Sequence, residues 1–295
     1  MTKIYAVTGS NKGIGYAIVK GLSEKISNAI IYLLARNSAL GESALTKLKS
    51  ESNGKQISEV KFHQLDITND ESSKRFAEYL KSTHGGLDVL VNNAGISGNY
   101  TGLGQGNTDP IDKEAEHVLG VNYYGTKRIT NALLPLIRPG GRIVNLCSLM
   151  GVMDGSGYMS NLGKYDEKYI HKFNSPDFTV KDVDEFVDDY IRLSKEEVKT
   201  GEPKRKQGGF FEGPYSAYAV SKASDIAYTV ALSRVVKDRN ITVNGCCPGY
   251  VGTDLNHNSG HLTTDQGADT PIYLATGENL PVGKFFSERK VVQWP

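Results

Sequence analysis

Hydrophobic and polar positions follow two alternating patterns along this chain. Short apolar or β-branched runs predict strands at residues 3–9, 29–36, 60–67, 87–95, 141–148 and 241–249. Helical spacing of apolar positions lies between them, at residues 13–26, 39–51, 71–83 and about 114–137, and again around Tyr218. Runs such as "DVLVN" are apolar throughout, which is typical of strands covered by helices on both faces. The order of elements predicts an α/β fold with a doubly wound parallel β-sheet.

One long polar stretch, from about residue 151 to residue 213, interrupts this alternation. Within it, apolar residues recur at helical spacing over residues 183–191. Thr179, with Asp182 three residues later, predicts a capping box at the start of that helix. We therefore expect a single dinucleotide-binding domain over residues 1–295, with a helical insertion at about 151–213.

Composition narrows the class of protein. Thirty-four Lys and Arg residues balance 33 Asp and Glu residues, so the net charge of +1 recommends neither nucleic acid nor an anionic membrane as partner. The cationic run at residues 204–206 is interpreted as a solvated loop. The three cysteines lack C-x-x-C spacing, and the sequence shows neither a signal-peptide pattern nor an apolar run of membrane-spanning length. These features predict a cytoplasmic protein. His257 and His261 fall in a predicted loop and are not expected to bind a metal.

The first predicted strand runs into a glycine-rich turn, "TGSNKGIG". Glycines let the backbone turn sharply and approach a pyrophosphate, which the amides at the start of the next helix can bind. The spacing is G-x-x-x-G-x-G, and its place between a strand and a helix predicts a Rossmann-type nucleotide site. The turn contributes the candidate cofactor residues Gly9, Ser10, Asn11, Lys12, Gly13, Ile14 and Gly15.

The end of the second predicted strand indicates which cofactor binds. NAD-binding domains typically place an acidic residue there, but this chain has Arg36. Arg36 and Lys12 together suit a 2′-phosphate, which favours NADPH, although each alone could be an ordinary surface cation. Asp66, with Ile67 at the end of the third predicted strand, could accept a hydrogen bond from the adenine amino group or simply cap a helix.

A tyrosine and a lysine lie four residues apart in "PYSAYAVSKASD". Residues at this spacing share a face of a helix, so Tyr218 is the partner of Lys222 and Tyr215 is not. A nearby ammonium favours the phenolate and so lowers the pKa of a tyrosine. The pair alone could equally line a solvated helix face.

Several motifs follow one another along the chain: the glycine turn, "NNAG" at residues 92–95, Asn122, Ser148, the Tyr218 and Lys222 pair, and "PGYVGTD" from Pro248. In these motifs and their order, the chain resembles the short-chain dehydrogenase/reductase family. Further segments such as "GGLDVLVNNAG", "CCPGYV", "GADTPIYLA" and "FFSERKVVQW" are similar to the monomeric NADPH-dependent carbonyl reductases within it. The resemblance covers nearly the whole chain. It implies reduction of carbonyl compounds by hydride transfer from NADPH.

The resemblance also implies roles for four residues. Tyr218 would be the general acid that protonates the carbonyl oxygen, and Lys222 would lower its pKa and bind the nicotinamide ribose. Ser148 would bind and orient the carbonyl oxygen, and Asn122 would hold a water that links Lys222 to solvent. Further cofactor contacts are implied for Asn93, Ala94, Gly95, Pro248, Gly249, Val251 and Thr253.

The substrate side is defined less closely by the sequence. Ser148, Tyr218, Met150 and Tyr250 are the candidate substrate residues, and Met153 and Cys247 could complete a soft apolar wall or could pack the core. Such a wall would admit quinones, aromatic ketones and aldehydes. Tyr250 stands where related enzymes often have Trp, and the insertion implies a monomer.

Two other functions are compatible with the sequence. One is a reductase dedicated to a single metabolite ketone, because such enzymes share an insertion of this kind. The other is a protein that senses NADP(H) without turnover, although relatives of that type usually lack the Tyr or the Lys.

Overall fold

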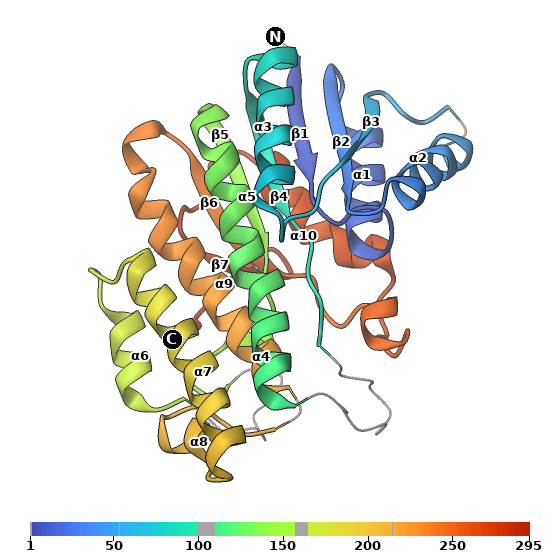
Figure 1. Ribbon diagram of the computed structural model, residues 1–295. Helices are drawn as coiled ribbons and strands as arrows, with labels where there is room; N and C mark the ends of the chain where they lie inside the picture. Colours follow the sequence, from blue (N-terminus) through green and yellow to red (C-terminus); the bar gives the residue numbers. More distant parts are fainter. Residues whose placement is uncertain (1, 53, 99–109, 157–164, 214) are drawn as a thin grey trace.

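A computed structural model describes residues 2–52, 54–98, 110–156, 165–213 and 215–295. Its sheet has the strand order β3-β2-β1-β4-β5-β6-β7-β8, parallel except for the antiparallel pair of β7 and β8 (Figure 1). The strands are β1 (Lys3–Val7), β2 (Ala29–Ala35), β3 (Glu59–Gln64), β4 (Leu87–Asn92), β5 (Ile137–Leu146), β6 (Thr242–Cys247), β7 (Phe285–Ser287) and β8 (Lys290–Val292). The predicted doubly wound parallel sheet is confirmed.

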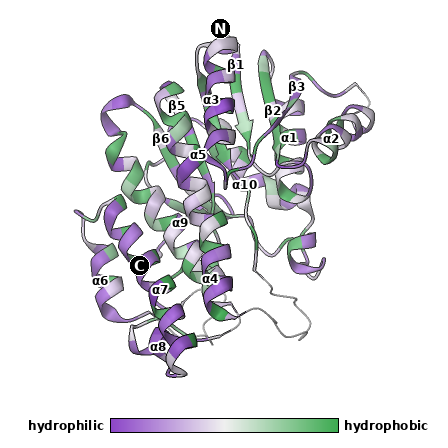
Figure 2. Ribbon diagram, viewed as in Figure 1, coloured by the Kyte–Doolittle hydropathy of each residue, from purple (hydrophilic) through white to green (hydrophobic). Residues whose placement is uncertain are grey.

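Helices cover both faces of the sheet. They are α1 (Gly13–Lys25), α2 (Ser38–Glu51), α3 (Asp70–His84), α4 (Ile111–Leu119), α5 (Thr126–Leu133), α6 (Glu167–Asn174), α7 (Val180–Thr200), α8 (Lys204–Gln207), α9 (Ser216–Val235) and α10 (Thr264–Thr276). One apolar core joins the sheet to α1, α2 and α10, and another joins it to α3, α4, α5, α7 and α9. Figure 2 shows the hydrophobic strands enclosed by helices whose outer faces are hydrophilic.

The helix predicted over residues 114–137 is interrupted. A π-helical segment, Gly120–Gly125, separates α4 from α5, and a 3₁₀ turn, Leu134–Leu136, leads into β5. π-Helical turns are rare and often occur at functional sites. Here the turn holds Asn122, whose side chain is buried.

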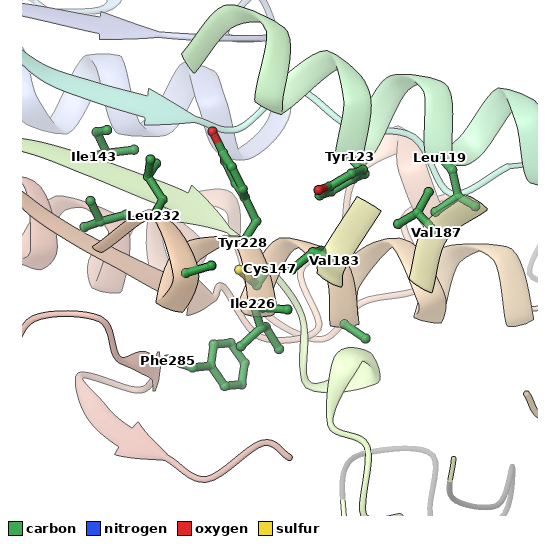
Figure 3. Packing of buried hydrophobic residues seen from close by; sticks show 14 of the residues in the cluster. Leu119, Tyr123, Ile143, Cys147, Val183, Val187, Ile226, Tyr228, Leu232 and Phe285 are labelled. Carbon is green, nitrogen blue, oxygen red and sulfur yellow. The ribbon is translucent and has the colours of Figure 1, made fainter. Parts of the chain in front are cut away.

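The insertion forms helices α6, α7 and α8, while its residues 157–164 lie outside the described part of the chain. The predicted capping box is confirmed, because Asp182 N–H donates to the Thr179 hydroxyl and Thr179 N–H donates to the Asp182 carboxylate. Figure 3 shows Val183 and Val187 of α7 packed beside Leu119 of α4 and Tyr123. The insertion therefore covers a face made by α4 and α9.

The cationic run at residues 204–206 does not form a solvated loop. These residues lie in α8, and Arg205 is only 3% exposed. Its guanidinium pairs with Glu197 of α7 and donates to the hydroxyl of Ser216, the first residue of α9. The expectation is wrong at Arg205 because its partners come from two other helices.

Candidate functional site

Helix α9 brings Tyr218 and Lys222 together as their spacing predicts. The Lys222 ammonium lies 5.7 Å from the centroid of the Tyr218 ring. Tyr215 precedes the first turn, where its carbonyl accepts from Ala219 N–H. Tyr218 is therefore the tyrosine that shares a face with the lysine.

The Lys222 ammonium is buried and has two strong partners. It donates to the Leu146 carbonyl at the end of β5 and to the Asp225 carboxylate, both at 2.9 Å. Asp225 was not singled out from the sequence, although its place three residues after Lys222 on the same helix was a signal. An ammonium has three N–H groups, so one remains for another acceptor.

Burial governs the protonation of this cluster. It raises the pKa of Tyr218, while the Lys222 charge and an interaction with the Ser148 hydroxyl act in the opposite direction. Lys222 thus acts as expected, but it does not outweigh burial. Burial also raises the pKa of Asp225 to about 6, against the pull of Lys222. Burial lowers the pKa of Lys222, but the Asp225 carboxylate, together with the Tyr218 hydroxyl when it ionises, raises it by more, so that the pKa exceeds its ordinary value.

Ser148 lies two residues after the end of β5, beside the hydroxyl of Tyr218. Its Oγ accepts from Met150 N–H at 3.1 Å and so caps a 3₁₀ turn, Leu149–Gly151. The hydroxyl is partly exposed and interacts with the side chains of both Tyr218 and Cys247. It can therefore donate to an oxygen placed next to Tyr218.

Asn122 links the π-helical turn to the "NNAG" segment. Its amide group exchanges hydrogen bonds of 2.8 Å with both backbone groups of Ile96 and donates to Ser221 at 2.9 Å. A Cβ placed on Gly95 would lie 3.2 Å from Asn122 Oδ1 and 3.8 Å from Lys222 Nζ. Asn122 and Lys222 are thus neighbours across Gly95.

The glycine turn is closely packed against the same segment. Gly9 and Gly13 have φ values of +61° and +58°, which L side chains rarely adopt. A Cβ on Gly15 would lie 2.4 Å from Asn93 Nδ2, which donates to the carbonyls of Thr8 and Gly9. Glycine avoids backbone strain at Gly9 and Gly13 and a steric clash at Gly15, and the bare backbone that results can approach a pyrophosphate.

The other predicted residues of the turn differ in what they can offer. Ser10 is buried, and both its N–H and its hydroxyl donate to backbone carbonyls of the fold, so it positions the turn. Lys12 is exposed and pairs with Asp254 at 2.7 Å. Arg36 is exposed and, within the described ranges, makes no ion pair, so its side chain can receive a phosphate. Asn11 and Ile14 are partly exposed.

The remaining predicted cofactor residues surround this turn. Asp66 accepts from the N–H and hydroxyl of Thr68, as in a simple strand-end turn, and Ile67 is largely buried. A Cβ on Gly13 would lie 3.5 Å from Thr253 Cγ2, so the segment over residues 248–253 faces the glycine turn. Of that segment, Val251 is buried, whereas Pro248, Gly249 and Thr253 are partly exposed.

The candidate substrate wall is only partly available. Met153 is fully buried and Cys247 is 4% exposed, so both pack in the core. Burial raises the pKa of the Cys247 thiol, which makes it a weak nucleophile. Met150 is partly exposed, and Tyr250 is 43% exposed with its hydroxyl 2.5 Å from that of Ser259.

Among the described residues, no cluster of three His, Cys, Asp or Glu side chains is arranged to hold a metal ion. No described helix is long and apolar enough to cross a membrane.

Comparison with known proteins gives consistent matches. The model of the family described as short chain dehydrogenase matches residues 3–160 and 207–263. Carbonyl reductase [NADPH] 1 of Bos taurus is 35% identical over 98% of this chain and 97% of that protein, and carbonyl reductase [NADPH] 3 of Rattus norvegicus is 34% identical over 99% of each.

Two solved structures extend the comparison to the fold. Salutaridine reductase from Papaver somniferum superposes with a TM-score of 0.81 at 28% identity, over 97% of this chain and 99% of that chain. Menthone neomenthol reductase from Mentha piperita gives 0.76 at 27% identity, with the same coverage.

Proposed function

The chain belongs to the short-chain dehydrogenase family, and from that premise we propose that it reduces carbonyl compounds with NADPH. The proposed substrates are quinones, ketones and aldehydes, and the products are hydroquinones and alcohols. The observation that carries the proposal is the meeting of Ser148, Tyr218 and Lys222 beside a glycine turn. Likeness to NADPH carbonyl reductases along the full chain supports it.

NADPH, when bound, would supply the hydride that adds to the carbonyl carbon. Negative charge then develops on the carbonyl oxygen, where the hydroxyls of Ser148 and Tyr218 can both donate hydrogen bonds. Tyr218 passes its proton to that oxygen as general acid, and solvent must restore the proton. Proton transfer from a positioned group typically accelerates a reaction about 10²- to 10⁴-fold.

Lys222 and Asn122 support this step without touching the substrate. The free N–H of Lys222 is available to a ribose hydroxyl of the cofactor or to a water. Asn122 lies beside it across Gly95, which suits the proposed water that links Lys222 to solvent.

The glycine turn and the facing segment over residues 248–253 form the proposed cofactor site. Arg36 would hold the 2′-phosphate, because its guanidinium is exposed and makes no ion pair in the described part of the chain. Lys12 would join it if its exposed ion pair with Asp254 opened, and such pairs contribute little stability. Asp66 would accept from the adenine amino group.

We propose a cytoplasmic monomer. The insertion already covers α4 and α9 with α7, so that face is not free for a second copy. The three cysteines are buried and unpaired, as expected in a reducing compartment.

A reductase dedicated to one metabolite ketone is the second candidate. Superposition with salutaridine reductase and menthone neomenthol reductase, over 97% of this chain in each case, favours it. A substrate profile with one strongly preferred ketone would separate it from a broad carbonyl reductase.

The test is the initial rate of NADPH oxidation with menadione and a panel of ketones, with NADH compared in parallel. We expect NADPH to be preferred and Tyr218→Phe to lower the rate about 10²- to 10⁴-fold. Tyr215→Phe, the matched control, should stay within about tenfold of the parent, because Tyr215 does not share the lysine's helix face.

Two results would count against the proposal. Full activity of Tyr218→Phe would remove Tyr218 from the role of general acid. Binding of NADPH without turnover on any carbonyl would favour a sensor of NADP(H).

A further inference from the structure

Asp225 is a buried carboxylate in contact with the proposed catalytic lysine. We propose that Asp225 is a positioning residue that acts through Lys222: it holds the ammonium in place and offsets its charge, so that Tyr218 keeps its proton and can donate it to a carbonyl oxygen up to a higher pH. This inference rests on the proposed function, because it assigns the pH range over which that site can reduce a carbonyl.

The geometry shows how Lys222 is held. Asp225 Oδ2 and the Leu146 carbonyl each accept from Lys222 Nζ at 2.9 Å, one from the same helix and one from the end of β5. Both side chains of the ion pair are less than a tenth exposed. Two fixed acceptors orient the third N–H of the ammonium, which is the one left for the cofactor ribose or a water.

Asp225 has no other counter-ion in the described structure. Its second oxygen, Oδ1, is buried without a hydrogen-bond partner. The other titratable groups that face it are the thiol of Cys147, the residue after β5, and the hydroxyls of Tyr218 and Tyr228 on its own helix. Burial raises the pKa of the Cys147 thiol and of both tyrosines, so these groups are neutral at pH 7. The carboxylate therefore acts mainly on Lys222.

The electrostatic effects of the Lys222 ammonium and the Asp225 carboxylate on the Tyr218 hydroxyl partly cancel, because the two charges are opposite and lie close together. The Lys222 ammonium alone would stabilise the Tyr218 phenolate, but the Asp225 charge opposes ionisation of the same hydroxyl. Reduction requires the phenol, which gives a proton to the carbonyl oxygen, and alcohol oxidation requires the phenolate, which takes one. A carboxylate beside the lysine thus extends the pH range of reduction upward.

The variant that tests the charge most directly is Asp225→Asn, which keeps the size of the side chain and an oxygen that can accept a hydrogen bond from Lys222. We expect the alkaline limb of kcat/KM for carbonyl reduction to move about one pH unit lower, because removal of the negative charge favours the phenolate. The acid limb for oxidation of the product alcohol with NADP⁺ should move lower by the same amount.

Ser224→Ala is the matched control on the adjacent residue. Ser224 is fully buried and donates only to the Val220 carbonyl, so the variant removes a buried polar group without touching the lysine. We expect its pH profile to superimpose on that of the parent. A profile of Asp225→Asn that also superimposed on the parent would overturn the proposal, because a purely structural role would leave the limbs in place.

A second readout does not depend on turnover. Ultraviolet difference titration of each protein against its Tyr218→Phe counterpart isolates the tyrosinate signal of Tyr218. In the parent, the midpoint should lie near or above the ordinary value of about 10, and in Asp225→Asn it should fall by about one unit. A midpoint near neutral pH in the parent would overturn the proposal even if Asp225→Asn did not fold.

The two readouts also separate this inference from the proposed function. If the parent reduced no carbonyl, but Asp225→Asn still lowered the titration midpoint of Tyr218, the proposed function would be refuted. The effect of the Asp225 charge on Tyr218 would still be supported. A parent that reduces carbonyls, with no shift in either readout, would refute the role of Asp225 alone.

Discussion

Arg205 provides a prediction about how the insertion supports the site. Its guanidinium makes two hydrogen bonds to the Glu197 carboxylate, at 2.8 and 3.1 Å, and donates to Ser216 at 2.8 Å and Tyr190 at 3.3 Å. The side chain is 4% exposed, against 18% for Glu197. Arg205 therefore joins α7 and α8 to the first residue of α9, two positions before Tyr218.

The magnitude follows from what Arg205→Met would leave behind. Methionine preserves most of the volume, but Glu197 becomes a largely buried charge without its cation, and two hydroxyls lose a donor. Breaking a buried pair from one side costs about 3–5 kcal/mol. Since Glu197 keeps some exposure, we expect about 3 kcal/mol, or a fall in Tm of about 5 °C for a chain of this length.

Thermal and urea unfolding of Arg205→Met would test this, with Lys206→Met as control. Lys206 is the neighbouring cation, 72% exposed, and its distant ion pair with Glu212 should contribute less than about 0.5 kcal/mol. The double variant Arg205→Met with Glu197→Gln should recover part of the loss, because it removes the unpaired charge. The reasoning would be refuted if Arg205→Met lost no more stability than Lys206→Met.

Two further predictions concern the cofactor and the insertion. Arg36→Glu should raise the KM for NADPH at least about tenfold, because a carboxylate repels the 2′-phosphate, and should leave the KM for NADH unchanged or lower. The control Lys49→Glu reverses an exposed charge on α2 and should change neither KM. Hydrogen bonds from Lys172 and from the Thr179 backbone lower the pKa of Asp182 to about 2, so its contribution to stability is present above about pH 4 and is lost as the pH falls toward 2. Asp182→Ala should therefore reduce the free energy of unfolding by about 1 kcal/mol at pH 7 and by less at pH 3, as urea unfolding at the two pH values would show.

The sequence by itself determined the elements that depend on local periodicity. Strands and helices alternate because apolar residues recur at the spacing of each element, and that alternation predicts a parallel sheet covered by helices. The capping box at Thr179 and the shared face of Tyr218 and Lys222 needed only residues three or four apart. The strands β7 and β8 have three residues each, too few to show a period.

What depends on distant residues could not be found in the same way. A cationic run is normally solvated, and nothing within α8 shows that Glu197 and Ser216 converge on Arg205. The π-helical turn that buries Asn122 also follows no local pattern, because the Asn122 side-chain amide is held by the backbone of Ile96, 26 residues earlier in the chain and just after β4.

Asp225 shows most directly how the two levels divide. The sequence shows that Asp225 lies three residues after Lys222, but many solvated ion pairs on helix surfaces have the same spacing. Only the tertiary structure removes water from both side chains and places the Leu146 carbonyl against the same ammonium. Burial makes the carboxylate's charge act on Tyr218, because electrostatic interactions are strong only where solvent does not screen them.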